Sequence, residues 1–177
     1  DDEDIISVSD SGLITGLSEG EAYIQISSYD DLSISNVVCV TVEKNSAPVV
    51  KEYTFTLLPS NFTTSYTNGT KTVTATNVNN NSDTKQVSLS YSYVMNQSST
   101  IQLKNETTAG IYNTTDLGTI SSVVINNNNG KLVTYYGNEQ NPSSGNTPNG
   151  GYFAIKKSGG SGNCTSIQVN FLDSSGE

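Results

Sequence analysis

Hydrophobic and polar residues alternate along most of the chain after residue 49. Over residues 87–95, one face of an extended strand would carry Val87, Leu89, Tyr91, Tyr93 and Met95. The same alternation recurs over 53–57, 72–76, 101–103, 121–125, 132–136, 153–155 and 167–171. Helical spacing of apolar residues is not seen in this region. The pattern predicts an all-β fold, an antiparallel two-sheet β-sandwich of jelly-roll type over residues 49–174.

The predicted turns are rich in asparagine and glycine. Asn68-Gly69, residues 126–130 and residues 149–151 supply side chains that tolerate positive φ. The longest polar stretch, 138–150, predicts the longest loop.

Glycines punctuate the first part of the chain. The stretch Ile6-Ser-Val-Ser-Asp-Ser-Gly-Leu-Ile-Thr-Gly-Leu17 is followed by Gly20-Glu-Ala-Tyr-Ile-Gln-Ile26 and by Val37-Val-Cys-Val-Thr-Val42. Over residues 4–43 this pattern resembles the C-terminal half of a bacterial immunoglobulin-like domain of group 2. The resemblance implies an exported or surface-anchored bacterial protein, in which such domains act as spacers and adhesive units rather than enzymes.

The predicted strands of this part are 5–8, 13–15, 22–28 and 36–42. A complete immunoglobulin-like sandwich needs about seven strands. In isolation, residues 1–46 would form a partial domain with unpaired edges and an open apolar face, and we expect this face to pack on the second domain or on a neighbouring molecule. We also expect that the missing strands, and the targeting segment of an exported protein, lie outside this sequence.

The second part resembles a jelly-roll module of the carbohydrate-binding type found in secreted bacterial proteins. The residues that carry this resemblance lie in Ser99–Lys104, Ile111–Val123, Leu132–Gly137 and Gly151–Lys156. It implies a β-sandwich over 49–174 that binds a ligand and has no catalytic role.

Charge changes abruptly at Asn45–Pro48. Ten acidic residues and one lysine precede Pro48, which leaves a charge of -9, whereas the seven acidic residues and seven lysines after it cancel. Such a shift predicts a domain boundary. The overall charge of -9 argues against nucleic acid and anionic membranes as partners. The sequence also has no apolar run that predicts membrane insertion.

The composition narrows the possible chemistry. Histidine, tryptophan and arginine are absent, which excludes imidazole catalysis and histidine-ligated metals. Glycoside hydrolysis needs two carboxylates across a cleft. The available acids lie in or beside predicted turns and outside any motif; they are Asp83, Glu106, Asp116 and Glu139. We therefore predict that the protein is not an enzyme.

No cofactor is predicted, although a structural calcium ion stays open because calcium takes carboxylate and amide oxygens. Conceivable ligands are Asp30 with Asp31, and Asp116 with Asn113. Ordinary turn chemistry explains the same residues. The two cysteines fall in different predicted domains, which favours free thiols over a disulfide. Cys39 is expected to be a small buried apolar residue.

Tyrosines are the best candidates for ligand contact. If Phe153 and Ile155 point inward, Tyr152 points outward, and the neighbours Tyr135 and Tyr136 must face opposite sides. Sugar rings dock on aromatic faces, and amides bind their hydroxyls. Tyrosine is also a common aromatic residue on β-surfaces, which leaves a structural interpretation open. The predicted ligand-binding residues are Tyr112, Asn113, Tyr135 and Tyr152.

Together these features predict a fragment of a secreted or cell-surface bacterial protein. An immunoglobulin-like spacer would precede a module that binds an extracellular glycan or a host surface protein. Two alternatives stay open: a purely structural spacer, and an accessory module of a secreted hydrolase. Oligomeric state does not follow from the sequence.

Overall fold

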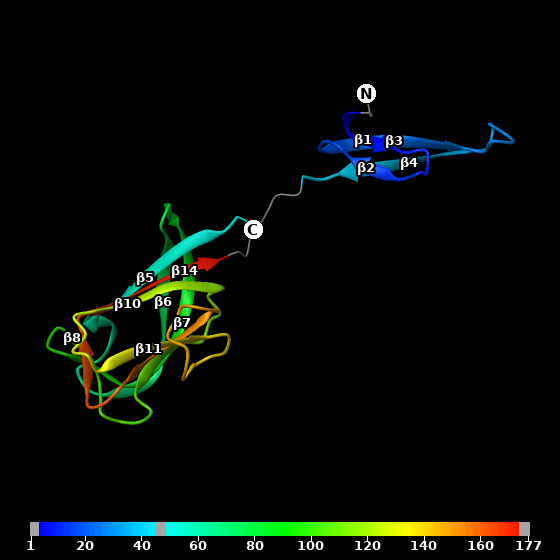
Figure 1. The fold of residues 1–177 in the computed structure, drawn as a ribbon. Coiled ribbons are helices and arrows are strands. Elements are labelled where there is room, and N and C mark those ends of the chain that lie inside the picture. The colour runs from blue at the N-terminus through cyan, green and yellow to red at the C-terminus, as the bar shows by residue number, and fades with distance from the viewer. Residues whose placement is uncertain (1–3, 45–48, 174–177) are drawn as a thin grey trace. The chain divides into compact units, whose positions relative to one another are not determined.

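The chain folds into two compact units, Asp1–Ala47 and Pro48–Glu177, in a computed structural model that describes residues 4–44 and 49–173 (Figure 1). The described residues form antiparallel strands, with one short 3-10 turn, η2 (Pro59–Asn61). The predicted all-β class is therefore confirmed. The division between the units falls within the segment where the charge changes.

The first unit consists of two β-hairpins. Strand β1 (Ile6–Val8) pairs with β2 (Ile14–Gly16), and β3 (Gly20–Ser27) pairs with β4 (Ser35–Val42). These strands begin and end close to the predicted positions. The turn between β1 and β2 needs Gly12, whose φ is 81°.

The apolar face of the β3–β4 hairpin is only partly covered. At one end Ala22 is fully buried, and a side chain at Gly16 would collide with Val42. At the other end Ile26 is 60 % exposed and Val38 is 40 % exposed. The expected open apolar face is therefore present. Cys39 lies opposite Tyr23, on the other face, and is exposed, so the prediction that it is buried was wrong.

The second unit is one large antiparallel sheet. Along the sheet the strands follow the order β10-β14-β5-β6-β7-β9-β12-β11, and β8 pairs with both β7 and β13. The ten strands are β5 (Lys51–Leu57), β6 (Thr67–Asn77), β7 (Asn80–Gln97), β8 (Thr100–Leu103), β9 (Gly110–Asn113), β10 (Thr119–Asn126), β11 (Leu132–Gly137), β12 (Tyr152–Lys157), β13 (Gly162–Cys164) and β14 (Ser166–Asp173).

The sheet curls round a shared interior, as the arrangement of β10, β11 and β14 in Figure 1 shows. Tyr136 on β11 faces the main chain of Val123 on β10, at the opposite end of the strand order. The two ends of the strand order are thus brought together, and the sheet is nearly closed. The result is a β-sandwich close to a barrel.

The core is built from alternate residues of these strands, as a period-two pattern requires. Tyr53 stacks on Phe171 with ring centroids 5.6 Å apart. The buried side chains of the central strands include Phe55, Leu57, Val87, Leu89, Ile111, Phe153, Ile155, Ile167 and Val169.

One irregularity interrupts β7. The pairing with β6 shifts between Thr67 and Gly69, and Tyr93 has a φ of 52°. Beyond this bulge Val94 is fully buried, so the inward face predicted for Met95 is wrong. The predicted turn at Asn68-Gly69 is also wrong, because both residues lie within β6.

Candidate binding face

Three of the predicted ligand-binding residues lie on one outer face of the sheet, around Ala154 on β12. Tyr112 on β9 and Tyr135 on β11 both pair directly with Ala154, one from each side. Tyr152 precedes Ala154 by two residues and therefore points to the same face. Phe153, between them, points into the core.

The tyrosines enclose a small central residue. Ala154 is fully buried, although it lies on the outer face, and the three tyrosines are half-buried. Neighbouring strands are about 4.8 Å apart, which separates the backbones of Tyr112 and Tyr135 by roughly 10 Å. The arrangement is a broad aromatic surface with a shallow centre, which we call the tyrosine face.

A hollow of about 330 Å³ adjoins the tyrosine face at Tyr112. Gly110 pairs with Ser92 on one side and with Lys156 on the other, so these residues share the outer face. A Cβ at Gly110 would lie 3.0 Å from the carbonyl oxygen of Ile155, and the position is therefore suited to glycine. The lining comprises Ser92, Thr107, Thr108, Ala109, Gly110, Tyr112, Asn141 and Lys156.

Lys156 provides the positive charge of this hollow. Its Nζ atom lies 3.5 Å from the carbonyl oxygen of Asn141, a long contact. Burial lowers the pKa of the Lys156 ammonium below its usual value. Sequence reasoning missed this residue, because its place beside Tyr112 depends on the pairing of β9 with β12.

Asn113 does not belong to the tyrosine face. It is fully buried, and its Nδ2 atom donates to the carbonyl oxygens of Thr115 and Gly151, each at 2.7 Å. Its Oδ1 atom accepts the main-chain N–H of Phe153, also at 2.7 Å. The sequence placed Asn113 beside a turn and made it a ligand-binding candidate, whereas it ends strand β9 with its side chain inward. Its structural role is to hold the start of β12 in place.

The long loop 138–150 borders the tyrosine face. Gln140 donates to the carbonyl oxygen of Thr114 at 3.1 Å, and the N–H of Tyr136 donates to the carbonyl oxygen of Gly145 at 2.9 Å. Residues of this loop line a further hollow of about 410 Å³. The loop is thus tied to β11 and to the end of β9.

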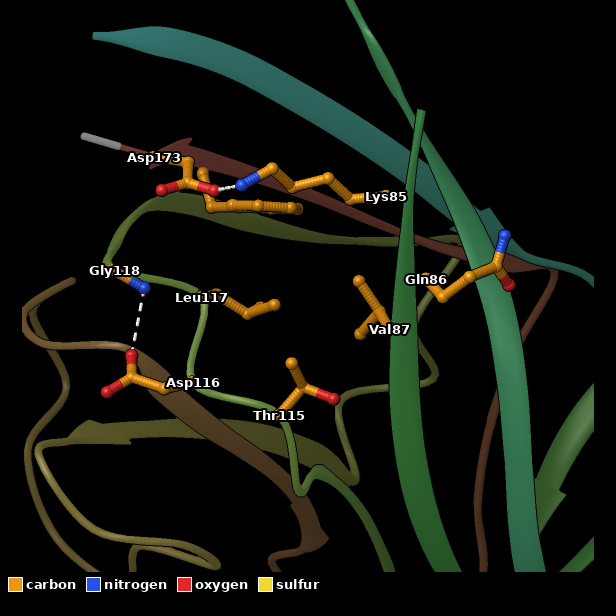
Figure 2. Close-up of a pocket in the computed structure, with 9 residues that line it drawn as sticks. Lys85, Gln86, Val87, Thr115, Asp116, Leu117, Gly118 and Asp173 are labelled. Atoms are coloured by element: carbon orange, nitrogen blue, oxygen red, sulfur yellow. Dashed lines mark hydrogen bonds and ion pairs between the residues drawn. The ribbon is translucent and has the colours of Figure 1, made fainter. Parts of the chain in front are cut away.

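Another hollow, of about 480 Å³, opens beside the turn that follows β9 (Figure 2). Leu117 and Val87 point into it, and the ion pair between Lys85 and Asp173 lies beside it. Asp116 accepts the N–H of Gly118 at 2.9 Å, as an ordinary turn residue does. The hollow is lined by core side chains, such as Leu117 and Val87, and by polar groups that already have partners within the protein.

Asp83, Glu106 and Asp31 are held in separate interactions, and Glu139 is exposed in the loop 138–150. Hydrogen bonds from Asn77, Lys51 and Tyr53 lower the pKa of Asp83 to about 2. Glu106 pairs with Lys104 at 3.2 Å. Asp31 accepts both the N–H and the hydroxyl of Ser33, which forms a turn. Within residues 4–44 and 49–173, no group of three or more acids or cysteines is placed to hold a metal ion.

Comparison with protein-family models, curated protein sequences and solved structures finds no match. Among the described residues, no helix is long and apolar enough to cross a membrane. The functional interpretation therefore depends on the geometry of the sheet.

Proposed function

We propose that the second unit is a non-catalytic binding module of an extracellular bacterial protein, and that the tyrosine face binds a glycan. The observation that carries this proposal is the convergence of Tyr112, Tyr135 and Tyr152 around Ala154 on one outer face. In this proposal the first unit serves as an immunoglobulin-like spacer.

The chemistry of the face suits a sugar ring. Aromatic faces offer apolar contact to the C–H groups of a sugar, while nearby hydroxyls and carbonyls satisfy its polar groups. Here the hydroxyls of Ser92, Thr107 and Thr108 and the carbonyl of Asn141 adjoin Tyr112. Because the rings are half-buried, their side chains lose less conformational freedom on binding than fully exposed side chains would.

A purely structural unit has no need to gather three half-buried tyrosines on one outer face. Tyr53 and Tyr136 of the same unit are buried in its core, and Tyr66, Tyr91 and Tyr93 are half-buried at other places in the unit. The convergence of Tyr112, Tyr135 and Tyr152 on one outer face, rather than their exposure, favours binding over a spacer role for the second unit.

Affinity electrophoresis and glycan arrays test the proposal with Tyr112→Ala, Tyr135→Ala and Tyr152→Ala in the full chain. We expect each variant to lose about tenfold in affinity, which corresponds to about 1.4 kcal/mol. Tyr29→Ala is the matched control, because Tyr29 is 99 % exposed and lies in the other unit. If all three variants bind like the parent, the tyrosine face is not the site.

A further inference from the structure

We infer that the glycan bound by the tyrosine face is acidic, and that it places a carboxylate or sulfate group in the hollow beside Tyr112, against the ammonium of Lys156. This inference rests on the proposed function and adds the chemical class of the ligand. It follows from the position of Lys156, from the residues that line the hollow, and from the lack of a carboxylate partner for Lys156 among residues 49–173.

The position puts the charge within reach of a stacked sugar. Lys156 follows Ala154 by two residues, about 7 Å along β12, and points to the same face. Tyr112 lies two residues from Gly110, which pairs with Lys156. A ring stacked on Tyr112 therefore has its substituents close to the hollow.

The lining suits an anion. Lys156 is the charged residue among those that line this hollow, and the hydroxyls of Ser92, Thr107 and Thr108 are neutral donors beside it. The volume of about 330 Å³ is at the small end of the range for ligand pockets, which fits one substituted sugar unit rather than an extended polymer.

Three other lysines of this unit, unlike Lys156, are paired with carboxylates. Lys51 pairs with Asp83 at 3.0 Å, Lys104 pairs with Glu106 at 3.2 Å, and Lys85 pairs with Asp173. Within residues 49–173, no carboxylate lies at ion-pair distance from Lys156, although its side chain is half-buried.

Burial without a counter-charge is unfavourable, and the lowered pKa of Lys156 has this cause. An anion bound in the hollow would offset that desolvation. The residues of the second unit carry no net charge, so they do not repel an acidic polymer as a whole.

The test uses matched polysaccharides and the full chain. Polygalacturonate is compared with its methyl ester, which removes the carboxylate charge, and dextran sulfate is compared with dextran. We expect the parent to bind at least one acidic polymer tenfold or more tightly than its neutral partner. Which pair shows this preference identifies the carboxylate or the sulfate as the recognised group.

Lys156→Gln should abolish the preference, and Lys156→Arg should restore most of it. Lys157→Gln is the matched control, since Lys157 pairs with Leu132 and faces the opposite side of β12. Urea unfolding of each variant checks that the fold is intact.

The two proposals fail in different ways. If the parent binds neutral and acidic polymers equally, or if Lys156→Gln keeps the preference while Tyr112→Ala loses binding, the acidic ligand is wrong and the tyrosine face stands. A loss of preference in Lys157→Gln equal to that in Lys156→Gln would show non-specific attraction of polyanions and also overturn the inference. If the parent binds none of these polymers or any glycan of the array, both proposals fail.

Discussion

Two polar side chains, Asp83 and Asn113, tie strands of the second unit together through hydrogen bonds. Asn113 connects β9 to the start of β12 and satisfies three main-chain groups in the interior. Asp83 on β7 accepts the hydroxyl of Tyr53 at 2.9 Å and the amide of Asn77 at 2.9 Å. Asn113 is fully buried and needs such partners, because an unpaired buried polar group costs about 1–3 kcal/mol.

The Asp83 network predicts a pH-dependent stability. Hydrogen bonds from Asn77, Lys51 and Tyr53 lower the pKa of Asp83 to about 2 in the folded protein, against 3.8 for the unperturbed group. Because the folded-state pKa is depressed, this contribution to stability is present above about pH 4 and is lost as the pH falls through 2.

Urea unfolding at pH 5, 3 and 2 measures this contribution. Asp83→Asn should lower the free energy of unfolding at pH 5 and reduce its decline between pH 4 and pH 2. Glu139→Gln, at an exposed loop position, is the control and should follow the parent. A parallel decline in parent and Asp83→Asn would mean that this network does not set the acid sensitivity.

The strands show how far local sequence determines an element. Alternation located most strands, because each buries one face and exposes the other. It missed β9 and β13, because Gly110–Asn113 and Gly162–Cys164 are short, begin with glycine, contain asparagine and show no period-two apolar pattern. The bulge at Tyr93 was missed for another reason, since it depends on which residues of β6 lie opposite.

The candidate site also has a part that the sequence predicts and a part that depends on how the strands pair. The outward direction of Tyr135 and Tyr152 follows from parity with buried neighbours, which the sequence shows. Asn113 was misassigned because its segment was interpreted as a turn, and a strand reverses which residue faces outward. The hollow at Lys156 combines residues of β7, β9 and β12. Such a combination depends on register between strands that are distant in sequence.

The bulge in β7 predicts an order of mutational effects opposite to simple alternation. Val94 is fully buried beyond the bulge, whereas Met95 is partly exposed. Val94→Ala should lower the free energy of unfolding by about 2 kcal/mol, through lost apolar burial and a residual cavity. Met95→Ala should cost less than about 1 kcal/mol. Urea unfolding of both variants checks the order, and a larger loss for Met95→Ala would contradict the bulge.

On the scale of the whole molecule, the two units differ in both charge and surface. The first carries the entire net charge of -9 on residues before Pro48, and it also exposes a large share of its apolar side chains. Charge of one sign opposes association and keeps such a surface soluble. The second unit is neutral and buries most of its large apolar residues in one core.

The open face of the first unit predicts that the folded chain binds an uncharged apolar dye. Contiguous exposed apolar surface is uncommon on folded domains and binds such probes. Ile26 and Val38 lie on the apolar face of the β3–β4 hairpin and are 60 % and 40 % exposed. We expect Nile red emission to rise with the native chain and to fall clearly in the double variant Ile26→Ser, Val38→Ser.

Tyr29→Ser is the control for loss of an exposed aromatic side chain outside this face, because Tyr29 lies beyond the end of β3. Nile red emission with this variant should equal that with the parent. Equal emission from the parent and the double variant would mean that the apolar face of β3 and β4 is covered in solution. The dye therefore separates an open hairpin face from one that is already covered, because only an open face offers Ile26 and Val38 to a small apolar molecule.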